Sequence, residues 1–176
     1  MGNNSKAKMK IVLALRPVLL FLAVLCFAAN CQAKNDCPWL NEATVGGLLG
    51  GDAVGEFAAA SAGQPAVCTF TQTAASFTRT LRITVEQTPD THMRLESAAQ
   101  ACGKDAVSLR AIGNEASMCT LENRNTGLSE LVVGRVRDQL FTITVATTLK
   151  NDPILTRETI KDKANTVAEQ VAGNLF

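Results

Sequence analysis

The cysteines beyond residue 33 are the side chains whose spacing best indicates a chemistry. They are Cys37, Cys68, Cys102 and Cys119. None of them forms a C-x-x-C pair, which argues against a zinc site and against dithiol redox catalysis. In an exported protein, an even number of well-separated cysteines is most simply two disulfides. Of the three possible connectivities we favour Cys37–Cys68 with Cys102–Cys119, because each pair brackets one compact group of elements.

No other pattern of residues predicts catalysis. His92 is the only histidine, so a serine hydrolase would need it as its base, and the chain has no G-x-S-x-G elbow. We expect His92 to be an exposed residue in the first turn of a helix. Acidic residues are spread singly along the chain, as solvated surface charges are. We therefore assign no catalytic, cofactor-binding or metal-binding residues and expect no cofactor.

Several residues that could bind a ligand have simpler structural interpretations. The glycine-rich segment 46–51 lacks the lysine and preceding strand of a phosphate loop, so we expect it to end a helix. Trp39 should pack against the first disulfide. Arg79 lies on an apolar strand face; we expect its head group to reach water at the strand edge, the alternative being a residue that guards a pocket. Arg135 and Arg137 share one face of a hairpin and should be solvated, the alternative being an anionic partner.

Residues 1–33 have the pattern of a signal peptide. Three lysines precede an apolar stretch at 11–29, and Cys31-Gln32-Ala33 offers small residues for cleavage after Ala33. The uninterrupted apolar part, 18–29, is shorter than the roughly 20 residues that span a bilayer. The sequence thus predicts one domain at 34–176 in the periplasm or outside the cell. Two alternatives remain, a lipid anchor on Cys31 and an uncleaved anchor helix.

The charge of the exported part excludes one class of partner. Removal of residues 1–33 takes four of the 17 basic residues and none of the 16 acidic ones, which leaves a net charge of −3. A weakly acidic domain without a basic run has no electrostatic footprint for nucleic acid. Membrane contact is expected only through the signal peptide or a lipid anchor.

Hydrophobic periodicity predicts the elements that position these residues. Helices are expected after an Asn41 cap and before Gly50, from Asp90 or Thr91 to Gly103, and from Asp152-Pro153 to the C-terminus. Strands are expected at 67–71, 77–87, 107–111, 118–121, 130–137 and 140–148, and an irregular connection within 46–65. Strand pairs joined by short turns imply an antiparallel sheet with helices packed on one face, an α+β fold.

This plan resembles a group of small bacterial envelope domains of unknown function. The likeness is carried by Cys37-Pro-Trp-Leu-Asn-Glu-Ala, by Leu48-Leu49-Gly50-Gly51, by Cys68 in the first strand, by Gly-Asn-Glu-Ala at 113–116 and by the hairpin at 132–145. The resemblance implies a PsbP-like α/β/α sandwich, often in a lipoprotein, and brings no catalytic residues with it.

The leading functional hypothesis is an exported, non-catalytic domain that binds a protein or a small ligand. A hydrolase that uses carboxylates or a Ser/His pair is the first alternative. A thiol-reactive stress protein is the second.

Overall fold

The computed structural model describes residues 36–123 and 127–176 of this 176-residue chain. The described residues belong to one compact unit. The expected signal peptide at 1–33, and Cys31 with it, lies outside the described residues. Within these ranges no helix is long and apolar enough to cross a membrane.

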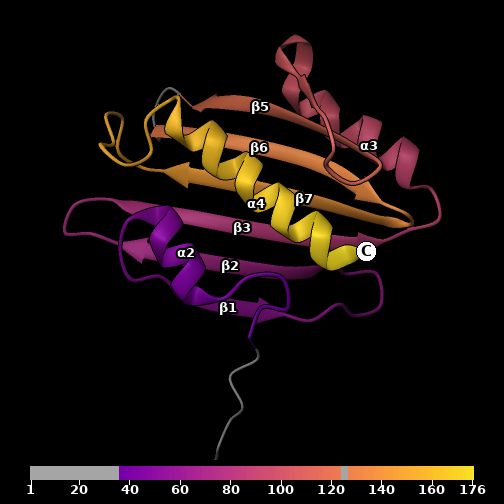
Figure 1. Cartoon of the computed structure of the whole chain (residues 1–176), viewed down its shortest axis with the longest axis horizontal. Coiled ribbons are helices and arrows are strands. Elements are labelled where there is room, and N and C mark those ends of the chain that lie inside the picture. The colour runs from indigo at the N-terminus through magenta and orange to yellow at the C-terminus, as the bar shows by residue number, and fades with distance from the viewer. Residues whose placement is uncertain (1–35, 124–126) are drawn as a thin grey trace, which may run out of the picture. The chain divides into compact units, whose positions relative to one another are not determined.

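Seven strands of the described residues form one antiparallel sheet, in the order β1-β2-β3-β7-β6-β5-β4 (Figure 1). Their bounds are β1 Val54–Ala58, β2 Ala66–Thr73, β3 Thr78–Gln87, β4 Val107–Leu109, β5 Glu115–Asn123, β6 Gly127–Val136 and β7 Gln139–Thr147. Buried residues alternate with more exposed ones along β3, as the hydrophobic periodicity of this segment predicts. The α+β class is confirmed.

Helices cover both faces of this sheet. The helices α2 (Glu42–Leu49) and α4 (Thr159–Leu175) lie on one face, and α4 runs diagonally across the strands in Figure 1. The helix α3 (Thr91–Ala99) and the 3₁₀ segment η2 (Gln100–Asp105) lie on the other. Alternation along β6 separates the two cores: Val132 packs in the α4 core, whereas Val133 packs with Leu95 of α3. The expectation of helices on one face only is therefore wrong.

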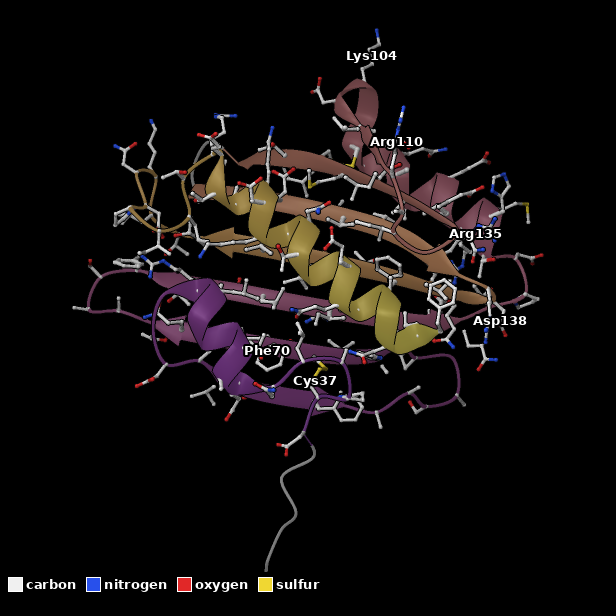
Figure 2. The ribbon with its side chains drawn as sticks, in the orientation of Figure 1. Cys37, Phe70, Lys104, Arg110, Arg135 and Asp138 are labelled. Carbon is white, nitrogen blue, oxygen red and sulfur yellow. A yellow bond between two sulfur atoms is a disulfide. The ribbon has the colours of Figure 1, made fainter. Side chains whose placement is uncertain are left out.

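Two disulfides join the favoured cysteine pairs. Cys37 bonds to Cys68 with an S–S distance of 2.03 Å, and Cys102 bonds to Cys119 at 1.99 Å. The first ties the N-terminal segment to β2, and Figure 2 shows Cys37 near Phe70 on that side of the sheet. The second ties η2 to β5. With sequence separations of 31 and 17 residues, loop closure of this kind contributes about 3–4 kcal/mol each.

Two elements differ from the expected plan. The segment expected to be irregular contains β1, an edge strand whose pairing with β2 is not signalled by its own side chains, which include Gly55 and Glu56. The last helix begins at Thr159 rather than at Asp152-Pro153. Asp152 still accepts backbone N–H groups, but they belong to a turn that brings Leu155 into the core.

Candidate functional site

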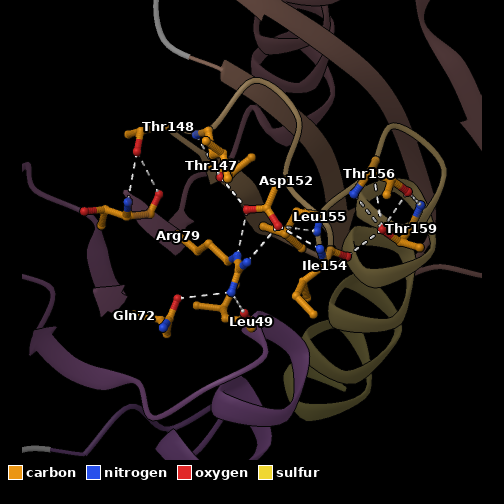
Figure 3. A network of polar contacts seen from close by, with 12 residues as sticks. Leu49, Gln72, Arg79, Thr147, Thr148, Asp152, Ile154, Leu155, Thr156 and Thr159 are labelled. Carbon is orange, nitrogen blue, oxygen red and sulfur yellow. Dashed lines mark hydrogen bonds and ion pairs between the residues drawn. The ribbon is translucent and has the colours of Figure 1, made fainter. Parts of the chain in front are cut away.

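A buried polar cluster is built on an ion pair between Arg79 of β3 and Asp152, in the segment before α4 (Figure 3). Arg79 Nε lies 2.7 Å from Asp152 Oδ2, and Arg79 Nη2 lies 2.8 Å from Asp152 Oδ1. The two side chains are 4% and 0% exposed. Arg79 does not reach water, contrary to expectation, because an acidic partner 73 residues later in the chain is buried against it.

Further hydrogen bonds link this pair to neighbouring elements. Arg79 Nη1 donates to the Leu49 carbonyl at the end of α2 (2.9 Å) and to Gln72 Oε1 of β2 (3.4 Å). Asp152 accepts bonds of 2.7–3.0 Å from the Thr147 hydroxyl and from the backbone N–H groups of Ile154 and Leu155. The cluster therefore joins α2, β2, β3, β7 and the segment before α4.

The electrostatics of this cluster indicate a structural role. Burial by itself raises the pKa of Asp152, but the hydrogen bonds from Arg79 and from the other three donors outweigh it and hold the pKa far below its usual range. Burial, and then the positive charge of Arg79, lower the pKa of Lys163, whose ammonium donates to the Leu48 carbonyl. Because the ion pair is closed to solvent, it offers no face to a ligand.

A polar pocket of about 300 Å³ lies between the start of α4 and the β4–β5 edge of the sheet. Glu130 of β6 and Thr120 of β5, which face each other across the two strands, form its inner part. Lys161 of α4, Arg157 and Asp105 of η2 are exposed and form its rim. The pocket thus combines one buried carboxylate with charges of both signs at its mouth.

Glu130 has the most unusual environment of the pocket residues. It is 1% exposed, and its Oε2 accepts a hydrogen bond from the Thr120 hydroxyl at 2.8 Å. Its Oε1 has no such partner, yet no fully buried side-chain oxygen or nitrogen of the described residues is unsatisfied. We conclude that Oε1 is in contact with the pocket. Burial raises the pKa of Glu130, while the Thr120 hydrogen bond and the through-space attraction of Lys161 and Arg157 oppose that rise.

A carboxylate in this position destabilises the fold when it is ionised, because it has lost water and has gained one hydrogen bond. Groups of this kind gather at functional sites. Glu130 is not identified by any motif, although it lies on the same face of β6 as Val132 and Val136, which pack in the α4 core. An acidic residue at an inward-facing strand position was the available signal.

His92, Glu115 and Arg135 form a second cluster, which is exposed. His92 lies in the first turn of α3 with 62% of its side chain exposed, as the sequence predicts. Its Nδ1 lies 3.2 Å from Glu115 Oε2, and its Nε2 lies 3.4 Å from Glu96 Oε1. Arg135 Nε donates to Glu115 Oε2 at 3.1 Å. These hydrogen bonds, first from Arg135 and then from His92, lower the pKa of Glu115.

The remaining candidates have structural roles. Arg137 lies in the β6–β7 turn, with its guanidinium 5.8 Å from the Phe176 ring centroid. Gly50, at φ 78°, ends α2, so the glycine-rich segment terminates a helix. Trp39 lies in the core that contains the first disulfide and makes an edge contact with Phe57 at 6.2 Å. No three His, Cys, Asp or Glu side chains of the described residues are grouped so as to hold a metal ion.

Comparison with known proteins adds no further constraint. No family model matches the chain, and no curated protein or solved structure matches it significantly. The pocket that contains Glu130 is thus the best-defined candidate site, and its geometry alone supports it.

Proposed function

We propose that this chain is an exported, non-catalytic domain of the bacterial envelope that binds a small ligand in the pocket of Glu130. It would act in the periplasm or outside the cell, or at the membrane if Cys31 carries a lipid. The two disulfides support an oxidising compartment. Helices on both faces of the sheet give the layer order that the resemblance to PsbP-like envelope domains implies.

The observation that carries the proposal is the position of the Glu130 carboxylate. One oxygen is held by Thr120, which fixes the orientation of the group, and the other oxygen is left to the pocket. A concave site with a few oriented polar groups is the usual form of a small-molecule site. The same feature favours a small ligand over a protein partner, because a protein surface does not easily reach a buried oxygen.

The two alternative functions have less support. His92 is exposed and faces two carboxylates rather than a serine. A thiol-reactive function requires a free thiol, and the four cysteines of the described residues are paired. A hydrolase that uses carboxylates would need a second acid beside Glu130, and Asp105 at the rim is the available one.

The test is a ligand panel measured by thermal unfolding of the processed protein purified from cells. The panel holds amino acids, organic acids, polyamines, monosaccharides and nucleosides at equal concentration. A compound at about 100 times its Kd stabilises the folded state by about 2.7 kcal/mol, which shifts Tm by several degrees in a domain of this size. At least one class should produce such a shift.

Two variants assign the shift to the pocket. Glu130→Gln should reduce the shift, because the amide keeps the shape of the side chain but not its charge. Glu158→Gln is the matched control, since this exposed carboxylate precedes α4 and does not line the pocket. A panel that leaves the wild-type Tm unchanged contradicts the proposal, and so does a shift of full size in Glu130→Gln.

A further inference from the structure

We infer that the pocket of Glu130 accepts a small zwitterion, a molecule with an ammonium group and an anionic group close together, such as a free α-amino acid. This inference rests on the proposed function, because it names the ligand class of the same site.

The inner part of the pocket presents a hydrogen-bond acceptor. Because Thr120 occupies Oε2 of Glu130, the remaining oxygen can accept a hydrogen bond from a ligand inside the pocket. An ammonium group is the best match, since it supplies both the donor and the opposite charge. A ligand with this group would replace the water that Glu130 has lost.

The rim carries charges of both signs, Asp105 of η2 and two basic side chains, and the basic side chains are its hydrogen-bond donors. Lys161 lies on the first turn of α4 and is exposed, and its ammonium makes no hydrogen bond or ion pair with the described residues. Arg157 also lines the pocket, and its positive charge acts on Glu130 through space. A carboxylate or other anionic group at the rim is therefore attracted while the ammonium of the same molecule reaches Glu130.

Ligands with a single charge fit the pocket less well. An anion alone would lie beside the Glu130 carboxylate, and an amine alone would lie beside Lys161 and Arg157, so each would meet a like charge. The volume of about 300 Å³ is at the lower end for small-molecule sites, which favours a ligand of amino-acid size. The zwitterion is the class that satisfies both charges in this volume.

The test compares three probes by amide chemical shifts of the processed, isotope-labelled protein. L-Alanine carries both charges, acetate carries only the anion and ethylammonium only the cation. L-Alanine should shift the amides of Thr120, Glu130 and Lys161 in a saturable way. Acetate and ethylammonium should bind at least about tenfold more weakly, because each loses one charge-assisted contact. The spectra also show whether each variant is folded.

Two substitutions separate the charges of the pocket. Glu130→Gln should weaken the binding of L-alanine by about tenfold and should not weaken the binding of acetate. Lys161→Met should weaken the binding of L-alanine and should not weaken the binding of ethylammonium. Glu158→Gln should change none of these affinities. If acetate or ethylammonium binds as tightly as L-alanine, the inference of a zwitterionic ligand is wrong, while the proposed function is not contradicted. If no probe and no member of the ligand panel shifts the pocket amides, both proposals fail.

Discussion

Replacement of Asp152 by asparagine tests the buried ion pair that links α2 and the segment before α4 to the sheet. Asparagine keeps the size of the side chain and one acceptor oxygen, so the turn at Ile154 and Leu155 can retain a hydrogen bond. The negative charge is lost. Arg79, which is 4% exposed, then keeps its own charge in the core without an ionised partner.

Removal of one partner from a buried, hydrogen-bonded pair of this kind costs about 3–5 kcal/mol. That is a large part of the roughly 5–15 kcal/mol that keeps a single domain folded. We therefore expect Asp152→Asn to lower the free energy of unfolding by this amount. The double variant Arg79→Met with Asp152→Asn should recover part of the loss, because the unpaired charge is removed as well.

The assay is urea unfolding at pH 7, followed by Trp39 fluorescence and with the disulfides intact. Glu115→Gln is the control, because it breaks the exposed pair with Arg135 and should leave the midpoint almost unchanged. A loss in Asp152→Asn as small as that of the control would refute the reasoning, since it would mean that Arg79 and Asp152 are solvated in the folded state.

The same pair should produce a defined pH dependence. The pKa of Asp152 is held far below the value of about 3.9 that an unfolded chain has. The contribution of ionised Asp152 to the free energy of unfolding is therefore fully present above about pH 5. It is lost progressively as the pH falls through the acid range. The difference in unfolding free energy between wild type and Asp152→Asn should accordingly narrow below about pH 4.

Three further measurements address the charge of Glu130, the second disulfide and the export signal. Glu130→Gln should raise the unfolding free energy at pH 7 by on the order of 1 kcal/mol. Burial raises the pKa of Glu130, so this gain should disappear below about pH 4, where the wild-type carboxyl is protonated in both the folded and the unfolded state. The double variant Cys102→Ser with Cys119→Ser should lose about 3 kcal/mol of stability, measured by the same urea unfolding. Intact mass of the protein from the envelope fraction should begin at Lys34, with four cysteines alkylated only after reduction; a diacyl or triacyl increment on Cys31 would contradict cleavage after Ala33.

Local patterns in the sequence were enough for the elements whose signal lies within one segment. The apolar residues that repeat along the last helix, from Ile160 to Leu175, are buried in α4. The alternation in β3 and the strong hairpin of β6 and β7 are also present. Both disulfides were predictable because each pair closes a short stretch of chain, so its partners are near in sequence.

Contacts between distant segments were decided by the tertiary structure. Arg79 is identifiable as a charge on an apolar strand face, but its partner Asp152 has the local pattern of a helix cap, and only the β3–β7 pairing brings the two together. Periodicity says which residues of a strand share a face, but not which helix covers that face, so the side taken by α3 was not predictable. The same limit applies to Glu130, whose burial and pocket depend on where α4 and η2 pack against β5 and β6.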